Sequence, residues 1–260
     1  MKRVHLLALG MIISVGILGY LWLWLEKTNT ELPKQGEVES NIKTKNKNII
    51  DLNYLDSTLR IVWFEVPNPN EIFLFSNLDE KKTAKALMQE KGCKNIVSGG
   101  FYTKEGEHIG LFVTEGEMLK KWAKNALFNG VFGIDSEGVV FVSEDMTQKD
   151  FRFAVQAGPI LIKNNSAQSL KLKNDQRERR IVVGTSEEGK AIFLVLFNPK
   201  SLFIGPNLAG LPSVLKMFEE KSGIKFKDAL NLDGGTASAF YSQEISLAEL
   251  SPIGSFFCIK

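Results

Sequence analysis

The chain opens with one long apolar segment, and the pattern changes sharply after it. Residues 6–25 are twenty positions without a charged side chain, and a helix of that length spans about 30 Å, the hydrocarbon thickness of a bilayer. Lys2 and Arg3 precede the segment, which predicts a cytoplasmic N-terminus and a translocated remainder. Trp22 and Trp24 fall at its far end, where indole rings favour the membrane interface. The pattern predicts a single-pass anchor in the inner (cytoplasmic) membrane.

Two other interpretations of residues 6–25 stay open. A signal peptide would be cleaved and would release the protein, although the apolar run is long and residues 23–26 offer no small-x-small cleavage site. A buried helix of a folded core is the other interpretation. Residues 26–53 are rich in Lys, Glu, Asn and Thr and have no sustained apolar period, which predicts a polar linker.

From residue 54 onward, short apolar runs alternate with turn residues, which predicts one folded domain over residues 54–260. Helical spacing of apolar residues, ended by glycine, predicts helices at residues 79–91 and 211–221. The predicted fold class is α+β (mixed α/β), a twisted and mostly β-sheet domain with a few flanking helices. The expected strands are residues 58–66, 72–76, 94–98, 109–114, 138–143, 152–156, 160–162, 181–184, 191–197, 229–232 and 237–241.

Composition narrows the classes of function. The chain has 32 Lys+Arg against 30 Asp+Glu, and Lys2 and Arg3 account for the whole surplus. Nucleic-acid binding, which usually needs a strong basic excess, is therefore not expected. With 2 Cys and 2 His, and with His5 in the apolar segment, a structural zinc site is also not expected. Cys93 and Cys258 could pair in an oxidising compartment or remain buried thiols.

Three predicted strands end in a polar residue close to glycine. Their sequences are SGGF at residues 98–101, QAGP at residues 156–159 and DGGT at residues 233–236. Glycine lets a ligand approach the main chain closely, and successive N–H groups in such turns form anion-binding concavities. The three ends would form the floor of a pocket if they converged. Taken singly, each is an ordinary turn.

The segment NLDGGTAS at residues 231–238, preceded by the predicted helix at 211–221, resembles the signature of the phosphodiester glycosidase family. This family includes many bacterial exported proteins that are often described as exopolysaccharide-related. The resemblance implies a hydrolase that cleaves a glycosyl phosphodiester of the N-acetylhexosamine-1-phosphodiester type, or a related envelope glycan. Further matches follow in the family's order, with SGGFY at residues 98–102, QAGPIL at residues 156–161 and RIVVG at residues 180–184.

The resemblance extends over residues 92–260 and implies roles for particular side chains. Asp233 is expected to act as nucleophile, base or metal ligand, and Arg180 offers a donor fork that suits phosphate. No cofactor is predicted, the need for a metal stays open, and the expected partner is a carbohydrate or sugar phosphate. The expected substrate-binding residues are Ser98, Gly99, Gly100, His108, Gln156, Gly158, Asn231, Gly234, Gly235, Thr236 and Ser238.

Simpler explanations exist for several of these residues. Asp233 could cap its own turn, as aspartate often does. Arg179 and Arg180 belong to a charged run, which is typical of a solvated surface. His108 could act as a general base, although a single loop histidine more often lies on the surface.

Two features leave the catalytic machinery open. Most glycosidases use two carboxylates, and the sequence does not rank Glu105, Glu107 and Asp135 for the second. The family pattern has Asn where Ser98 stands and Thr where Ile181 stands. These departures favour the alternative, a catalytically inactive glycan-binding or envelope/exopolysaccharide assembly protein on the same fold.

Overall fold

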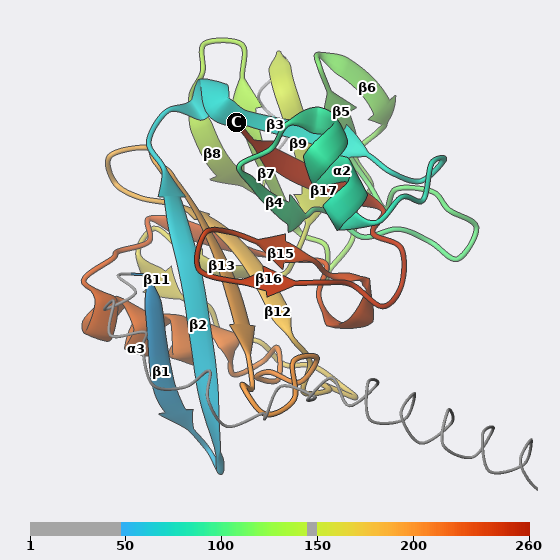
Figure 1. Ribbon diagram of the computed structural model, residues 1–260. Helices are drawn as coiled ribbons and strands as arrows, with labels where there is room; N and C mark the ends of the chain where they lie inside the picture. The colour runs from blue at the N-terminus through green and yellow to red at the C-terminus, as the bar shows by residue number, and fades with distance from the viewer. Residues whose placement is uncertain (1–47, 145–149) are drawn as a thin grey trace, which may run out of the picture. The chain divides into compact units, whose positions relative to one another are not determined.

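The computed structural model describes residues 48–144 and 150–260 (Figure 1). The predicted anchor at residues 6–25 and the linker as far as residue 47 lie outside the described residues. Within the two described ranges, no helix is long and apolar enough to cross a membrane. These ranges form three β-sheets and two α-helices, so the prediction of a mostly β-sheet α+β domain is confirmed.

The largest sheet has the strand order β1-β2-β13-β12-β14-β10-β11, and every neighbouring pair is antiparallel. In β2, Ile61 and Trp63 pack with helix α3 (Leu211–Ser222), whereas Val62 and Phe64 face the core shared with the other sheets. A strand covered on both faces needs this nearly unbroken apolar run. The strands are β1 (Ile49–Tyr54), β2 (Ser57–Val66), β10 (Ile160–Lys163), β11 (Ser166–Ala167), β12 (Arg180–Thr185), β13 (Ala191–Phe197) and β14 (Asp228–Leu232).

Two five-stranded sheets have the orders β16-β15-β4-β17-β3 and β6-β5-β9-β7-β8. Strand β17 lies between β3 and β4 and is antiparallel to both. The predicted strand at 72–76, helix at 79–91 and strand at 94–98 are confirmed as β3, helix α2 (Ala84–Lys91) and β4. The first sheet contains β3 (Ile72–Ser76), β4 (Asn95–Ser98), β15 (Phe240–Tyr241), β16 (Ser246–Leu247) and β17 (Ser255–Ile259). The second contains β5 (Phe112–Thr114), β6 (Glu117–Lys120), β7 (Gly130–Asp135), β8 (Val140–Ser143) and β9 (Phe151–Ala157).

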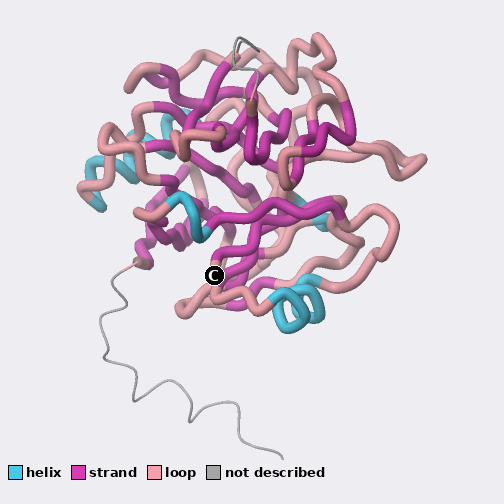
Figure 2. Tube along the Cα trace, turned by 90° about the horizontal axis from the view of Figure 1, so that it is seen from above, coloured by secondary structure: helices cyan, strands magenta, loops and turns pink. Residues whose placement is uncertain are grey.

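One phenylalanine from each sheet meets at the centre of the fold. The ring centroids of Phe132 on β7 and Phe193 on β13 are 6.0 Å apart, and Phe257 on β17 lies 5.5 Å from the first and 5.2 Å from the second. All three rings are fully buried. Figure 2 shows the strands gathered in the middle of the molecule and the helices at its periphery. The three sheets therefore share one apolar core.

The folded region begins earlier than residue 54. Strand β1 lies within the predicted linker and pairs with β2, with Ile49 opposite Val62. A short edge strand between polar residues is hard to recognise, because only alternate side chains need to be apolar. Several other strands were not predicted at all, namely β6, β7, β11, β16 and β17. Two predicted strands are shorter than expected, since residues 109–111 and 237–239 lie outside β5 and β15.

Helix α2 begins five residues later than predicted, at Ala84 instead of residue 79. The side chain of Asn77 accepts the Lys82 N–H at 3.0 Å and donates to the Lys82 carbonyl at 3.0 Å, which holds the preceding segment in a loop. Thr83 then caps the helix by accepting the N–H of Ala86 at 3.3 Å. The local hydrogen bonds of Asn77 and Thr83 thus compete successfully with the helical pattern.

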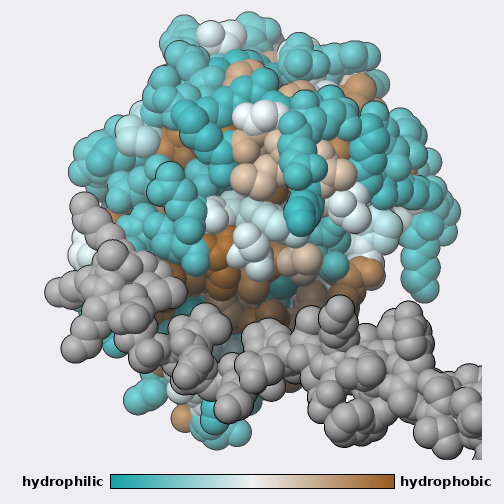
Figure 3. Space-filling view, viewed as in Figure 1, coloured by the Kyte–Doolittle hydropathy of each residue, from teal (hydrophilic) through white to brown (hydrophobic). Residues whose placement is uncertain are grey.

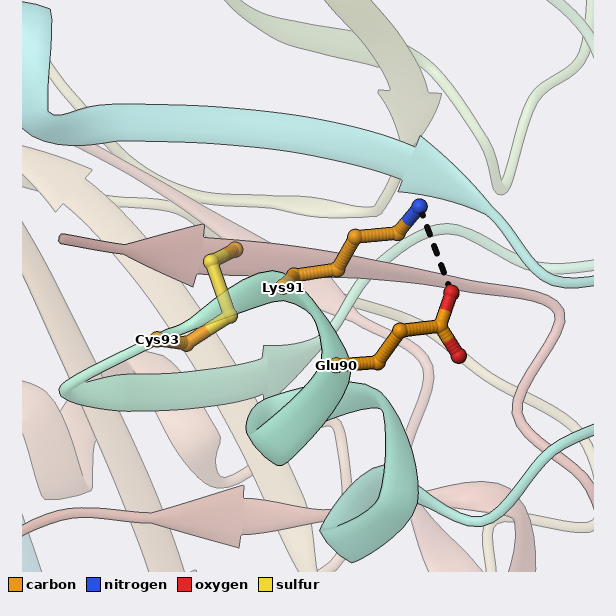
Figure 4. The surroundings of a disulfide bond; sticks show 4 residues. Glu90, Lys91 and Cys93 are labelled. Atoms are coloured by element: carbon orange, nitrogen blue, oxygen red, sulfur yellow. Dashed lines mark ion pairs between the residues drawn. A yellow bond between two sulfur atoms is a disulfide. The ribbon is translucent and has the colours of Figure 1, made fainter.

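Cys93 and Cys258 form a disulfide, which settles the choice between a pair and free thiols (Figure 4). Cys93 lies just after helix α2, beside the ion pair of Lys91 and Glu90, whose charged atoms are 3.6 Å apart. Cys258 is on β17, so the bond links the turn after α2 to a central strand. Both cysteines are buried.

The composition of the chain is nearly balanced in charge, with 32 Lys+Arg against 30 Asp+Glu. The face drawn in Figure 3 is mostly hydrophilic, with apolar side chains gathered across its middle. An anionic ligand would therefore be held by a few placed groups, because the chain offers no broad positive field.

Candidate functional site

Asp233 follows strand β14 and is bonded directly to the end of strand β4. Its N–H donates to the Gly99 carbonyl at 3.0 Å, and its own carbonyl accepts the Ser98 hydroxyl at 3.2 Å. The predicted residues Ser98, Gly99 and Asp233 are therefore brought together. The contacts are made by the main chain of Asp233, which leaves its carboxyl group for other partners.

The third glycine-containing strand end joins the same group. Gly158 donates its N–H to the Asn231 carbonyl at 3.0 Å, and the Asn231 side-chain amide donates to the Gly158 carbonyl at 2.9 Å. A side chain at Gly100 would come within 2.5 Å of Val155 on β9, so only glycine allows these segments to approach. The three strand ends converge, as a pocket floor requires.

The carboxyl group of Asp233 has an unusually high pKa. The residue retains a little solvent contact, yet protein atoms enclose the carboxyl group, and this burial raises its pKa to about 8. The negative charge of Glu178 raises the pKa further, and the Gly234 N–H partly offsets both effects. At neutral pH Asp233 is mostly protonated, which favours a proton or hydrogen-bond donor over the predicted nucleophile, base or metal ligand.

Arg180, at the start of β12, is largely held by protein groups. Its Nε donates to the Pro206 carbonyl at 3.1 Å and an Nη donates to the Gln176 carbonyl at 2.5 Å. Its guanidinium also lies 3.6 Å from Asp175 and 3.7 Å from Glu178. Burial lowers the pKa of Arg180, while Glu178 and Asp175 raise it. The donor fork is thus fixed in place, with only part of it available to a phosphate.

A cavity of about 300 Å³ lies beside Arg180. Small-molecule sites commonly occupy roughly 300–1,000 Å³, so this one suits a ligand the size of one sugar ring. Its two cationic and two anionic side chains balance, and amides and leucines complete the wall. The lining residues are Leu127, Leu172, Lys173, Asn174, Asp175, Gln176, Glu178, Arg180 and Leu208.

Gln156 is a structural clamp in place of the predicted sugar ligand. Its Oε1 accepts the N–H groups of Leu111 at 2.9 Å and Ala123 at 3.1 Å. Its Nε2 donates to the carbonyls of Ala123 at 2.6 Å and Phe128 at 2.7 Å. A buried amide that makes all four hydrogen bonds to the main chain has none left for a hydroxyl. It joins β9 to the segment that ends beside the cavity.

Most of the predicted glycine donors are already engaged. Gly99 donates its N–H to the Ser255 carbonyl at 2.8 Å, Gly100 donates to the Ser255 hydroxyl at 2.9 Å, and Gly235 donates to the Arg179 carbonyl at 2.8 Å. Gly234 acts on the Asp233 carboxyl itself. The anion-binding role predicted for these N–H groups is therefore not supported, because Ser255 and Arg179 already accept their hydrogen bonds.

Ser238 and Thr236 differ in position. Ser238 is fully buried, accepts the Arg179 Nε at 2.8 Å and donates to the Gly235 carbonyl at 2.7 Å, so it supports the glycine turn. Thr236 is exposed, and its carbonyl accepts the N–H groups of Leu250 and Ser251. Only Thr236 presents its side chain to solvent.

His108 belongs to the packed interior. Its ring stacks on Phe112 with 3.6 Å between centroids, and its Nε2 lies 3.0 Å from the Ser76 hydroxyl. Burial lowers its pKa to about 4, with a further lowering by Lys120 and a smaller raising by Asp79. The neutral, stacked ring contradicts a surface position, and its contacts with Ser76 and Phe112 do not include the strand-end group.

None of the three carboxylates named for a second role is tied to Asp233. Glu107 pairs with Lys120 at the surface at 2.7 Å, and Asp135 accepts main-chain N–H groups in the turn after β7. Glu105 lies in an exposed loop. The carboxylate whose charge acts on Asp233 is Glu178, which the sequence analysis missed. Glu178 precedes Arg180 by two residues, and side chains two residues apart in an extended chain lie on the same face. This spacing could have indicated that Glu178 and Arg180 lie together.

Among residues 48–144 and 150–260, no three His, Cys, Asp or Glu side chains cluster in a way that could hold an ion. The groups at the site are instead one enclosed carboxyl, one ion-paired guanidinium and one half-exposed glutamate.

The chain is similar in sequence to one protein family and in fold to several solved structures. A sequence model described as phosphodiester glycosidase matches residues 91–257. The catalytic domain of zebrafish N-acetylglucosamine-1-phosphodiester alpha-N-acetylglucosaminidase, auto-inhibited by its pro-peptide, is similar in fold, with 18% identity, 81% of each chain covered and a TM-score of 0.61. A hypothetical protein from Synechocystis has 12% identity and a TM-score of 0.55, over 82% of this chain and 61% of the other. No curated protein sequence matches significantly.

Proposed function

Because the chain belongs to the phosphodiester glycosidase family, we propose that it is a hydrolase of glycosyl phosphodiesters, of the N-acetylhexosamine-1-phosphodiester type or from a related envelope glycan. One observation carries the proposal. Three glycine-containing strand ends converge on Asp233, whose enclosed carboxyl keeps its proton near neutral pH. A perturbed acid at a site built from several strand ends is typical of an active site.

The neutral state of Asp233 suits an anionic substrate. A phosphodiester carries one negative charge, which an ionised aspartate would repel. The protonated carboxyl can instead donate a hydrogen bond to a phosphate oxygen, and the fixed charge of Arg180 attracts the same group. The cavity beside Arg180 has the size and the mixed polar and apolar lining that a sugar needs.

In the proposed reaction the bond between the anomeric carbon and the phosphate oxygen breaks. The electron pair of that bond leaves with the phosphate, and an oxygen from water forms the new bond to carbon. A phosphate monoester is already a stabilised anion, so it departs with little help from a strong acid. The protein's main tasks are then to hold the phosphate and to activate water.

Isotope labelling tests the reaction. We expect the protein to hydrolyse the methyl phosphodiester of N-acetylglucosamine 1-phosphate in ¹⁸O-labelled water and to release methyl phosphate without the label. Mass spectrometry of the phosphate distinguishes the outcomes. Label in the phosphate would mean attack at phosphorus and would overturn the glycosidase assignment. Measurable glycan binding without turnover of a panel of such diesters would support the inactive glycan-binding alternative.

We also propose that the domain works outside the cytoplasm, held to the inner membrane by residues 6–25 or secreted after their cleavage. The disulfide of Cys93 and Cys258 supports this location, because cytosolic thiols are normally kept reduced. We expect the two cysteines to be paired in protein taken directly from its own cells with free thiols alkylated at lysis. Peptide mass spectrometry checks this, and alkylated Cys93 and Cys258 would contradict the location.

A further inference from the structure

The carboxylate of Glu178 lies against Gly235, in the turn that carries Asp233. A Cβ atom at Gly235 would lie 3.1 Å from the Oε2 atom of Glu178 and 3.3 Å from its Cδ. The backbone of Gly235 is left-handed, with φ of 60°, which also favours glycine. The loop before β12 thus places a carboxylate directly against the turn that carries Asp233.

The carboxylate of Glu178 also faces the cavity. Its side chain lines the cavity wall and remains 44% exposed, and its Oε2 lies 3.7 Å from an Nη of Arg180. A half-exposed carboxylate at a cavity wall can contact water and ligand together. The adjacent Arg180 fixes its direction without enclosing it.

The other carboxylate of the cavity wall has a different task. Asp175 accepts the N–H groups of Leu208 and Ala209, each at 2.7 Å, and the Asn207 side chain at 3.2 Å. These contacts anchor the segment that leads into helix α3. Asp175 therefore has a structural role. Glu178 is the other carboxylate of the cavity wall, and it remains available to react with a ligand.

The carboxyl groups of Glu178 and Asp233 lie in different electrostatic environments. Asp233 is enclosed, and the charge of Glu178 adds to the burial that keeps it protonated. The other titratable group that responds to Asp233 is Tyr102, whose pKa is raised first by burial and then by the Asp233 charge. Two neighbouring carboxyl groups in such different environments divide readily into one that holds a proton and one that accepts it.

We propose that Glu178 is the second catalytic carboxylate, a general base that activates the attacking water while the sugar lies in the cavity beside Arg180. This inference rests on the proposed glycosidase function. Glu178 takes a proton from water as the water oxygen bonds to the anomeric carbon, and the phosphate leaves with the electron pair of the broken bond. Asp233 donates a hydrogen bond to the departing phosphate, and Glu178 then returns its proton to solvent. Direct attack by water inverts the anomeric configuration.

Glu178→Gln and Glu178→Ala test the assignment with the methyl phosphodiester of N-acetylglucosamine 1-phosphate. We expect Glu178→Gln to lower kcat by about 10²-fold or more with a small change in KM, as loss of a general base does. Azide, which needs no deprotonation, should restore turnover of Glu178→Ala at least tenfold and give the glycosyl azide of inverted configuration. Glu220→Gln, at an exposed site on helix α3, is the matched control and should retain wild-type kinetics.

The outcomes separate the two proposals. Wild-type protein without turnover would refute the glycosidase function itself. With an active wild type, kcat of Glu178→Gln within threefold of it, or a loss in Glu178→Ala that azide does not relieve, would overturn the role of Glu178. If Glu178→Ala does not fold, Glu178→Asp replaces it and should regain part of the Glu178→Gln loss, because it keeps the base on a shorter arm. Retention of configuration by the wild type would also refute a general base and indicate a nucleophile.

Discussion

Asp233→Asn is expected to lower kcat by about tenfold and, at the same time, to make the folded protein more stable above neutral pH. Asparagine has the same shape and can still donate a hydrogen bond to the phosphate, but an amide is a weaker donor than a carboxylic acid. Wild-type activity should fall as pH rises through about 8, because Asp233 then ionises and repels the phosphate. The residual activity of the variant should lack this decline. Steady-state rates between pH 6 and pH 9.5 measure both effects.

The effect on stability follows from the direction of the pKa shift. The pKa of Asp233 is about 8 in the folded protein and near 3.8 when unfolded, so the folded state binds the proton more tightly. Its contribution to stability is complete below the unfolded pKa and is lost progressively as pH rises through the folded pKa. Between pH 5 and pH 8.5 wild type should lose on the order of 4 kcal/mol that Asp233→Asn does not lose.

Urea unfolding at the two pH values measures this difference, and Asp56→Asn is a suitable control. Asp56 is exposed beside Arg177, whose hydrogen bond lowers its pKa, so Asp56 stays ionised in both states throughout that pH range. Its variant should show no pH-dependent difference from wild type. Equal pH dependence of Asp233→Asn and wild type would mean that Asp233 titrates normally and would remove its proposed role.

The local pattern of the chain was enough to predict much of the fold. Strands such as β2 and β13 are runs of β-branched and aromatic residues covered on both faces, and the pattern shows this directly. Strand β1 was not predicted because it directly follows a long polar segment and its pairing with β2, which is distant information for a local pattern, supplies the context. The start of helix α2 was misplaced because Asn77 and Thr83 bind the main chain, an effect that apolar spacing does not express.

Only part of the site could be predicted from the sequence, because the rest depends on contacts between residues far apart in the chain and on burial. The strand ends around Asp233 are marked by glycines, which a close approach of backbones requires, so their convergence could be expected. Glu178 reaches Gly235 across a sequence separation that no short motif spans. Gln156 was misassigned because an amide bonds main-chain groups and sugar hydroxyls equally well, and only burial decides between them.

The run of charges at residues 177–180 shows most clearly that residue type alone does not reveal burial. A charged run is typical of a solvated surface, yet Arg179 is fully buried. Its Nε donates to the Ser238 hydroxyl at 2.8 Å, an Nη donates to the Ala248 carbonyl at 3.0 Å, and its guanidinium lies 4.4 Å from the centre of the Phe203 ring. Burial lowers its pKa to about 10, and the negative charge of Glu249 opposes that lowering.

Arg179→Met is therefore expected to lower the free energy of unfolding by on the order of 3–5 kcal/mol, because the acceptors of its fork lose their donor and the half-buried Glu249 loses a nearby positive charge. Urea unfolding at pH 7 measures the loss. Arg177→Met, in the same run, is the control. Arg177 is partly exposed and pairs with Asp56 at 2.9 Å, so its replacement should cost about 1 kcal/mol or less. Equal losses from the two variants would contradict the structural role of Arg179.

A second substitution, at Glu249, separates the contribution of the Arg179 charge to stability from that of its hydrogen bonds. The Glu249 Oε1 accepts the Ala84 N–H at 2.7 Å at the start of helix α2, while its Oε2 is buried without a hydrogen bond. In Arg179→Met this carboxylate would be left uncompensated, so Glu249→Gln added to Arg179→Met should recover about 1–2 kcal/mol. Glu249→Gln alone should destabilise, since Arg179 would then lack its counter-charge. Simple additivity of the two substitutions would show that the hydrogen bonds of Arg179, and not its charge, hold the turn beside Asp233 in place.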